Sequence, residues 1–202
     1  MDPVGTLHDF WRQRHPDGNV PEDYLNTRRS ELLLPLIEDL PLAAKILEVG
    51  FNIGRNLAYL HDHGYENLAG VEISPHAVDL LRVHHPQLEG VPIHVGPAED
   101  ELDRFADKEF DLVFTMAVLE HIHPDSRRVI DNIVRCGRHV LTVEPGEGSQ
   151  HRSHRRYAWD LRAEFAARGM RLASSRPIEE IRVLGNDETD LRGYVASRFE
   201  SG

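Results

Sequence analysis

A turn rich in glycine follows a short apolar stretch in the first quarter of the chain. Lys45–Val49 has the pattern of a buried strand, and Gly50, Asn52 and Gly54 come directly after it. A helical pattern then begins at Arg55. A strand, a glycine turn and a helix N-terminus bind nucleotide-like ligands, because the first backbone N–H groups of a helix have no partner within it. The stretch therefore predicts a nucleotide-like ligand.

The spacing of this turn separates classes of ligand. A dinucleotide-binding turn needs G-x-G-x-x-G, and the corresponding positions hold Gly50, Asn52 and Arg55, so two of the glycines are absent. The Gly-Lys-Ser/Thr of a phosphate-binding P-loop is also absent. Read as G-x-G-x-G, the positions hold Gly50, Asn52 and Gly54, and asparagine is the non-glycine residue that best tolerates positive φ. An NAD-dependent oxidoreductase is therefore a disfavoured alternative.

Two acidic residues end the first two predicted strands. Glu48 lies in a buried strand, where an unpaired carboxylate is costly, so it either orders a ligand or pairs with a cation such as Arg55. Glu72 follows Gly50 by roughly 20 residues, which is the spacing expected of an acid that binds ribose hydroxyls. Both positions predict contacts with the ligand of the turn.

Two histidines follow the fourth predicted strand in the segment EHIHPD. A histidine at the carboxyl end of a parallel strand faces the crevice and titrates near neutral pH, so His121 and His123 are candidate general bases. Alternatively, His121 only packs against the ligand, and Pro124-Asp125 only starts a helix. None of the 13 histidines has cysteine or carboxylate partners at the spacing of a known metal site, so no metal is expected.

A dense basic run, Gln150–Tyr157, follows the fifth predicted strand of an otherwise acidic chain. Guanidinium groups pair with carboxylate, phosphate or phosphonate, so the run predicts an anionic substrate, although charge runs are more commonly solvated surface. Arginines in the N-terminal helix, which is expected to fold over the site, are further candidates. The predicted substrate-binding residues are Arg28, Arg29, Arg152, Arg155, Arg156 and Tyr157.

Short apolar segments alternate with helical patterns from residue 45 onward. The predicted strands are Lys45–Val49, Leu68–Ile73, Pro92–Val95, Asp111–Met116, His139–Val143, Arg171–Ser174 and Tyr194–Phe199. The predicted helices are Arg55–His63, Pro75–His84, Asp125–Arg135 and Tyr157–Arg168. This alternation predicts an α/β fold, a doubly wound, mostly parallel, seven-stranded Rossmann-like sheet with helices on both faces. No helix separates the last two strands, so the last strand is expected to be antiparallel.

The N-terminal part of the chain precedes this alternation. Pro21–Leu40 has apolar residues at helical spacing, and Pro35 should kink or split the helix. We expect residues 1–42 to form an N-terminal helical cap and residues 43–202 to form the catalytic domain.

Composition excludes several classes of protein. The net charge of −11 argues against a general nucleic-acid binder, because phosphate backbones attract positive surfaces. No apolar run is long enough to cross a membrane, and the polar N-terminus does not resemble a signal peptide. The single cysteine, Cys136, is typical of a reducing cytoplasm. We expect a cytoplasmic protein whose partner is a small molecule; the oligomeric state stays open, with a homodimer among the options.

The motifs LEVGFNIGRN, GVEIS, GPAED, FDLVFTMAVLEHIHPD and LTVEP occur in one order and spacing between Leu47 and Pro145. Together they resemble class I S-adenosylmethionine-dependent methyltransferases. The resemblance implies S-adenosyl-L-methionine as cofactor and S-adenosyl-L-homocysteine as product. It also implies that Glu48 orders the methionine ammonium, that Glu72 binds ribose and that Ile73 packs on adenine. The cofactor-binding residues it implies are Glu48, Gly50, Asn52, Gly54, Arg55, Asn56, Glu72, Ile73, Ala98, Glu99, Thr115 and Met116.

Asn52 departs from the middle glycine of the family motif. The turn G-x-N-x-G-R-N, the segment PEDYL and HIHPD are similar to a subset of small bacterial O-methyltransferases that resemble the phosphonate O-methyltransferase of dehydrophos biosynthesis. This resemblance implies O-methylation of a small anionic metabolite in natural-product biosynthesis. N-methylation, methylation of a sugar or glycan, and a non-catalytic cofactor-binding protein remain alternatives.

Overall fold

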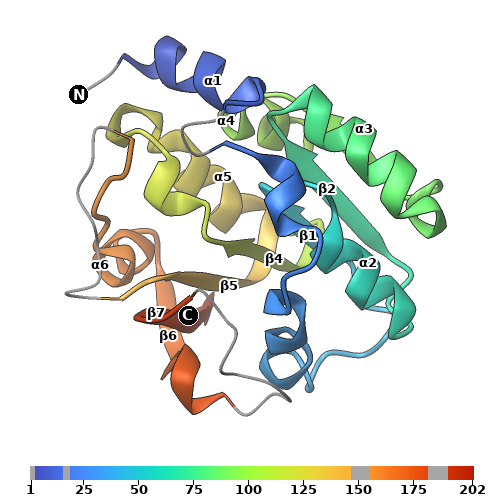
Figure 1. Ribbon diagram of the computed structural model, residues 1–202. Coiled ribbons are helices and arrows are strands. Elements are labelled where there is room, and N and C mark those ends of the chain that lie inside the picture. The colour runs from blue at the N-terminus through green and yellow to red at the C-terminus, as the bar shows by residue number, and fades with distance from the viewer. Residues whose placement is uncertain (1–2, 16–18, 147–154, 182–190) are drawn as a thin grey trace.

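The computed structural model describes residues 3–15, 19–146, 155–181 and 191–202 (Figure 1). Its strands are β1 (Ile46–Val49), β2 (Leu68–Glu72), β3 (Ile93–Val95), β4 (Phe110–Met116), β5 (Gly137–Pro145), β6 (Met170–Pro177) and β7 (Tyr194–Ser201). They form one seven-stranded sheet in the order β3-β2-β1-β4-β5-β7-β6. Strands β1 to β5 pair in parallel, and β7 runs antiparallel to both β5 and β6. The predicted doubly wound sheet with an antiparallel last strand is confirmed.

Helices connect the parallel strands. The α-helices are α1 (Val4–Arg12), α2 (Arg55–Asp62), α3 (Pro75–His84), α4 (Ala98–Glu101), α5 (Arg128–Cys136) and α6 (Leu161–Ala166). Short 3-10 helices occupy Pro21–Tyr24, Arg29–Leu32, Leu34–Leu36, Pro86–Leu88, Leu102–Arg104, Leu119–His121, Pro124–Ser126 and Ile178–Glu180. No helix among the described residues combines the length and apolar character needed to cross a membrane.

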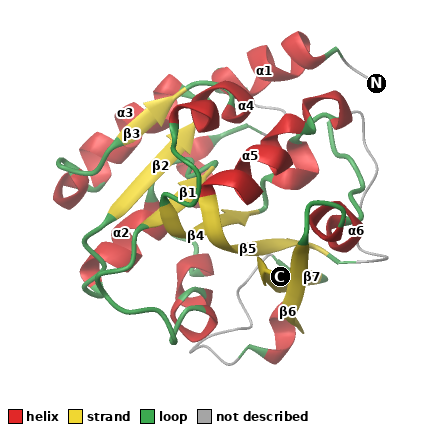
Figure 2. Ribbon diagram, turned by 180° about the vertical axis from the view of Figure 1, so that it is seen from behind, coloured by secondary structure: helices red, strands yellow, loops and turns green. Residues whose placement is uncertain are grey.

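Apolar side chains fill both faces of the sheet, as alternating strand residues require. On one face, Phe114 of β4 belongs to a hydrophobic cluster that includes Leu57 of α2 and Leu81 of α3. On the other face, Val113 belongs to a second cluster, to which α5 and α6 contribute side chains such as Ile130. Figure 2 shows the sheet from behind, with α5 and α6 on one side of it and α2 and α3 on the other.

The strand order reverses between β1 and β4, because the chain builds β2 and β3 on one side of β1 and β4 on the other. Open α/β sheets bind ligands at the carboxyl ends of the strands at this point. Helix α1 lies across this end of the sheet (Figure 1), and it supplies Leu7, His8 and Trp11 to the cavity there. The fold therefore places a cavity between the strand ends and the N-terminal segment.

The prediction of a helix over Pro21–Leu40 is wrong. Three short 3-10 helices replace it, and Pro21 and Pro35 stand in the first turns of two of them, where the missing N–H is tolerated. The predicted apolar face is nevertheless buried, since Leu32, Leu33 and Ile37 are at most 1% exposed. Helix α1, in contrast, was not predicted from the polar N-terminal sequence.

The C-terminal elements correspond to the expected ones with shifted bounds. Helix α6 is shorter than the predicted Tyr157–Arg168, because Asp160 caps it by accepting a hydrogen bond from the backbone N–H of Ala163 at 2.9 Å. Strands β6 and β7 form the expected antiparallel hairpin. Most of the predicted loop between them, Gly185–Leu191, lies outside the described residues.

Candidate functional site

The glycine turn after β1 has the backbone conformation that its sequence predicts. Gly50, Asn52 and Gly54 have φ angles of 73°, 54° and 77°, so the expected left-handed asparagine is confirmed. A Cβ atom on Gly54 would lie 2.4 Å from Cδ1 of Leu81. Gly50 and Asn52 line the cavity, whereas Gly54 shapes the turn beneath it. The turn therefore places backbone atoms of Gly50 and Asn52 in the wall of the cavity at the carboxyl end of β1.

Glu48 of β1 presents a half-satisfied carboxylate to the cavity. Its side chain is 2% exposed, and Oε1 accepts a hydrogen bond from Nδ2 of Asn56 at 2.7 Å. Oε2 is buried and has no hydrogen-bond partner among the described residues. Burial raises the pKa of Glu48 to about 8, against smaller opposing effects of Asn56 and the Arg55 charge. Such an atom is suited to accept a hydrogen bond from a cationic ligand group.

Arg55 and Asn56 begin α2 and line the cavity. The Arg55 side chain is directed at the N-terminal segment, where Nε donates to Oγ of Ser30 at 2.8 Å. Its guanidinium also donates to Oγ1 of Thr27. Glu48 and Arg55 are thus connected through Asn56, which hydrogen-bonds to both side chains, and the predicted alternative of a direct salt bridge does not describe this contact.

Glu72 ends β2 and accepts one backbone hydrogen bond on each carboxylate oxygen. The donors are the N–H of Asn52 at 2.8 Å and the N–H of Ser74 at 2.9 Å. Burial raises the pKa of Glu72, and these two hydrogen bonds oppose that effect. A carboxylate has about four lone-pair sites, so two remain for ligand hydroxyl groups. Ile73 follows in the cavity wall.

The segment after β3 forms the far wall of the cavity. Ala98 and Glu99 begin α4 and line the cavity. Oε1 of Glu99 accepts a hydrogen bond from Oγ of Ser126 at 2.9 Å and lies 3.0 Å from Nε2 of His8 in α1. Glu99 thus connects the cavity wall to the N-terminal helix.

The end of β4 is held by a buried acid that the sequence reasoning did not identify. Thr115 is fully buried and lies outside the cavity lining, and its hydroxyl donates to Oε1 of Glu144 in β5 at 2.9 Å. Glu144 also accepts from the N–H of Val118 at 3.0 Å, just after Ala117 with its φ of 58°. Burial raises the pKa of Glu144 to about 7. Met116 continues into the cavity wall. The sequence feature that could have indicated this role is the acid of the motif LTVEP, which is Glu144.

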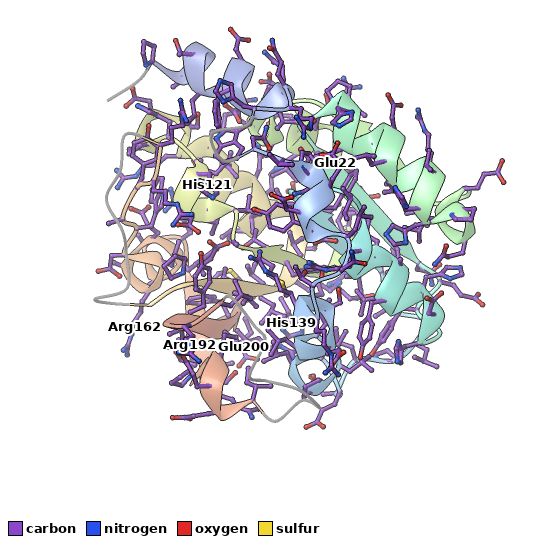
Figure 3. The ribbon with its side chains drawn as sticks, in the orientation of Figure 1. Glu22, His121, His139, Arg162, Arg192 and Glu200 are labelled. Carbon is purple, nitrogen blue, oxygen red and sulfur yellow. The ribbon has the colours of Figure 1, made fainter. Side chains whose placement is uncertain are left out.

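His121 lies in the cavity wall beneath α1 (Figure 3), with the ring of Trp11 4.4 Å from its own ring. Its Nδ1 is 3.2 Å from the carbonyl oxygen of Arg155. Because a carbonyl can only accept a hydrogen bond, Nδ1 carries the proton and Nε2 is the free base of the neutral ring. Burial lowers the pKa of His121, with Glu120 as the main opposing charge.

His123 also lines the cavity but has a capping contact. Its Nδ1 accepts a hydrogen bond from the backbone N–H of Asp125 at 3.0 Å, at the start of the 3-10 helix Pro124–Ser126. The neutral ring therefore carries its proton on Nε2, which makes that nitrogen a hydrogen-bond donor and not a base. Tyr157 packs edge-on against this ring, with centroids 5.2 Å apart. Of the two histidines, His121 has the geometry of a base.

The predicted arginines are divided between the cavity and its surroundings. Arg29 and Arg156 line the cavity. Arg28 instead pairs with Glu31 at 2.6 Å, and the guanidinium of Arg155 lies 3.7 Å above the ring of Phe10 in α1. Neither of these two side chains lines the cavity, and Arg152 lies outside the described residues.

Glu120 and Tyr194 complete the cavity wall near His121, and the sequence reasoning named neither of them as a site residue. The Tyr194 hydroxyl, from β7, donates to Oε1 of Glu120. Oε2 of Glu120 lies 3.5 Å from Nε of Arg156, and Nε2 of His121 lies 3.8 Å from Oε1. Glu120 precedes His121 in the motif EHIHPD, so its position could have been noticed from the sequence. Tyr194 reaches the cavity only because β7 pairs with β5, which no local sequence pattern indicates.

The cavity as a whole has a volume of about 200 Å³, and its lining includes Glu48 and Glu72 near the ends of β1 and β2 and Glu99 in α4. Two buried oxygens in its wall, Oε2 of Glu48 and Oδ1 of Asn52, have no partner among the described residues. The unpartnered oxygen of Glu48 is suited to a ligand ammonium group, and the remaining lone pairs of Glu72 are suited to a diol. Within the described part of the chain, no group of three or more His, Cys, Asp or Glu residues could hold a metal ion.

Residues 47–139, slightly less than half of the chain, match the family model described as a methyltransferase domain. The matched range runs from β1 into β5 and contains the glycine turn, Glu48, Glu72 and His121. None of the curated proteins matches the sequence.

Solved structures share the fold over nearly the whole chain. A TehB-like SAM-dependent methyltransferase from Corynebacterium glutamicum is 21% identical over 98% of each chain, with a TM-score of 0.64. A chain from the complex between the Haloferax volcanii Trm112 methyltransferase activator and a methyltransferase is 17% identical, over 98% of this chain and 97% of that chain, with a TM-score of 0.70. A Haemonchus contortus phosphoethanolamine N-methyltransferase, solved with phosphomonomethylethanolamine and S-adenosylhomocysteine, is 17% identical over 100% of this chain and 62% of its own, with a TM-score of 0.67.

Proposed function

We propose that this chain, which carries a methyltransferase domain of class I fold with S-adenosylmethionine as its cofactor, methylates an oxygen atom of a small anionic metabolite. The cofactor supplies an activated methyl group on a sulfonium, so the protein has to align the acceptor oxygen with that carbon and exclude water. The observation that carries the proposal is that Arg29 and Arg156 line the same cavity as Glu48.

The cofactor half of the cavity is assigned to the acids at the strand ends. Oε2 of Glu48 would accept a hydrogen bond from the methionine ammonium, and Glu72 would bind the ribose hydroxyls with its remaining lone pairs. Ile73, Ala98 and Glu99 would border the adenine. The unpartnered oxygen of Glu48 and the left-handed glycine turn support this arrangement.

The acceptor half of the cavity is assigned to its cationic lining residues Arg29 and Arg156. Arg29 is 9% exposed, and its guanidinium lies 5.0 Å from the ring of Tyr24. Arg156 contacts Oε2 of Glu120 through Nε at 3.5 Å, and its terminal nitrogens would bind the anion. Guanidinium groups pair with carboxylate, phosphate and phosphonate, and of these two arginines Arg29 is buried whereas the Arg156 side chain is 43% exposed.

The need for a base depends on the acceptor oxygen. A carboxylate or phosphonate is already ionised, so orientation by arginine is sufficient. A hydroxyl acceptor would lose its proton to Nε2 of His121, which the Arg155 carbonyl leaves unprotonated. Glu120, 3.8 Å from this nitrogen, would then stabilise the charged ring.

A second candidate is an amine that also carries an anionic group. Glu120 and Tyr194 provide acceptor atoms in the same cavity as Arg29 and Arg156, which would suit a molecule with both charges. The Haemonchus structure contains such a molecule, phosphomonomethylethanolamine. This candidate predicts N-methylation and a requirement for Glu120.

A panel of acceptors in matched pairs tests the proposal. Each carboxylate, phosphonate and phosphate is compared with its neutral amide or ester and with an amine of similar size, and formation of S-adenosylhomocysteine is measured. The proposal expects turnover confined to the anionic member of a pair and a KM raised at least tenfold in Arg156→Ala. Turnover of neutral members at equal rates would overturn it, and turnover confined to anionic amines would favour the second candidate.

A further inference from the structure

We propose that Ser30 is a positioning residue for the cofactor carboxylate Glu48 and acts on it through Asn56. This inference rests on the assignment of Glu48 to the methionine ammonium in the proposed function. Ser30 belongs to the N-terminal segment, before the methyltransferase domain match begins at residue 47, so no motif of that domain contains it. It therefore adds a contribution from outside the domain to the cofactor site.

Three buried side chains form a continuous series of hydrogen bonds. Oγ of Ser30 donates to Oδ1 of Asn56 at 2.8 Å, and Nδ2 of Asn56 donates to Oε1 of Glu48 at 2.7 Å. The exposed fractions are 4% for Ser30, 5% for Asn56 and 2% for Glu48. Because these groups are almost fully buried, a lost partner cannot be replaced cheaply.

The series determines which way the Asn56 amide faces. Its Oδ1 accepts from Ser30 and also from the Arg55 guanidinium at 3.1 Å, so the oxygen is held on the side of the N-terminal segment. The NH₂ group is consequently directed at Glu48. When Glu48 is ionised, as it is expected to be with a bound ammonium group, the reverse orientation would place the amide oxygen against the carboxylate, where two acceptors repel. Ser30 and Arg55 together thus select the amide orientation that Glu48 requires.

The amide orientation in turn leaves one defined oxygen of Glu48 for a ligand. Oε1 is occupied by Asn56, and Oε2 has no partner among the described residues. If the amide turned, Oε1 would lose its donor, and the buried carboxylate would favour its protonated form more strongly. A protonated or reoriented Glu48 is a poorer acceptor for an ammonium group.

Arg55 fixes Ser30 at the other end of the series. Nε of Arg55 donates to Oγ of Ser30 at 2.8 Å, and the same guanidinium contacts Thr27 and the carbonyl oxygen of Tyr24 at 3.4 Å. The serine hydroxyl therefore accepts from Arg55 and has its own proton for Asn56. Since Tyr24 and Arg29 of this segment also line the cavity, one segment supports both halves of the site.

Two product-like ligands distinguish this role from a general structural one. S-adenosylhomocysteine contains the amino-acid part, whereas 5′-methylthioadenosine has the same adenosine and sulfur without it. Calorimetry on Ser30→Ala should give a Kd for S-adenosylhomocysteine about tenfold weaker and an unchanged Kd for 5′-methylthioadenosine. Arg55→Lys, which keeps the charge but loses the planar fork, should show the same selective loss.

A matched control comes from the adenine side of the cavity. Ser126 is 7% exposed, and its hydroxyl is bonded to Glu99, so Ser126→Ala removes a comparable contact near a part that both ligands share. This variant should change the two Kd values by the same factor. Equal weakening of both ligands by Ser30→Ala, or no weakening of either, would overturn the inference.

The double variant Ser30→Ala, Glu48→Gln separates this inference from the assignment of Glu48. If Ser30 acts through Glu48, the serine change should have no further effect on S-adenosylhomocysteine binding once Glu48 is glutamine. Additive losses would overturn the inference alone. A Glu48→Gln variant that keeps the wild-type preference for S-adenosylhomocysteine over 5′-methylthioadenosine would instead refute the assignment of Glu48 itself.

Discussion

Asn56 donates from Nδ2 to Oε1 of Glu48 at 2.7 Å, and Oε2 of the same buried carboxylate has no hydrogen-bond partner among the described residues. A buried carboxylate with one satisfied oxygen is a costly feature unless a ligand completes it. The predicted ligand group is the methionine ammonium of the cofactor. Glu48→Gln should therefore weaken S-adenosylhomocysteine binding by about 2 kcal/mol, or about 30-fold, measured by calorimetry.

Binding of the cofactor product should release a proton. Burial raises the pKa of Glu48 to about 8, so the free protein holds this carboxyl largely protonated at pH 7. A bound ammonium favours the ionised form and lowers that pKa, so affinity should rise with pH, up to about tenfold per unit, and level off above pH 8. Calorimetry in buffers of different ionisation enthalpy should detect close to one proton released. Equal release from Glu48→Gln would contradict this source of the proton.

The stability of the cofactor-free protein should fall as the pH rises. The pKa of Glu48 is about 8 in the fold against an ordinary 4.5, so the folded state keeps a proton that the unfolded state loses above pH 4.5. The free energy of unfolding should thus decrease from about pH 5 to pH 8, by about 4 kcal/mol. Chemical denaturation at several pH values measures the slope. Glu48→Gln should reduce the slope and leave the part that comes from Glu144 and Glu72, whose pKa values are also raised; an unchanged slope would place the titrating group elsewhere.

The glycine turn should tolerate no side chain at Gly54. Its φ is 77°, and an added Cβ would lie 2.4 Å from Leu81 Cδ1. Gly54→Ala should lower the free energy of unfolding by about 2 kcal/mol or more and weaken cofactor binding, since the turn would shift. Gly169→Ala is the control, because its φ is 78° but nothing lies within 4 Å of the added atom. Equal losses in both variants would show that backbone strain alone is responsible.

Substitutions of the neighbouring residues Arg155 and Arg156 should affect different properties of the protein. Arg156 lines the cavity, so Arg156→Ala should raise the KM for the acceptor and leave the Kd for S-adenosylhomocysteine within about twofold. Arg155 packs 3.7 Å above the Phe10 ring, so Arg155→Ala should weaken the packing of α1 and lower the free energy of unfolding by about 1 kcal/mol. Acceptor kinetics and thermal unfolding of both variants decide this. Identical effects would remove the distinction between a binding arginine and a structural one.

The sheet and the position of the acids at the ends of β1 and β2 could be predicted because they depend on local signals. An apolar strand, a turn with positive φ and an acid at the strand end lie within a few residues of one another, as at Lys45–Gly54 and at Glu72. The distribution of the arginines could not be predicted in the same way. Arg155 and Arg156 are adjacent in sequence, yet one packs on Phe10 and the other lines the cavity.

The missed residues are those whose role depends on a distant partner. Tyr194 meets Glu120, and Ser30 meets Asn56, only after the sheet and the N-terminal segment have come together. The N-terminal helix prediction failed for a related reason. Packing of Leu32, Leu33 and Ile37 on the core is achieved by short 3-10 turns, so the apolar spacing alone did not specify an α-helix.

The central claim is that the methyl group is transferred to an oxygen of an anionic acceptor. Identification of the atom that receives the methyl group tests this claim most directly. S-adenosylmethionine labelled with ¹³C in the methyl group is incubated with the protein and the acceptor panel, and the products are examined by two-dimensional NMR, in which O-methyl, N-methyl and C-methyl signals are separate. The proposed function predicts a labelled O-methyl signal on an anionic acceptor, strongly reduced in Arg156→Ala. A labelled N-methyl signal, or binding of S-adenosylhomocysteine without any transfer to the panel, would contradict it.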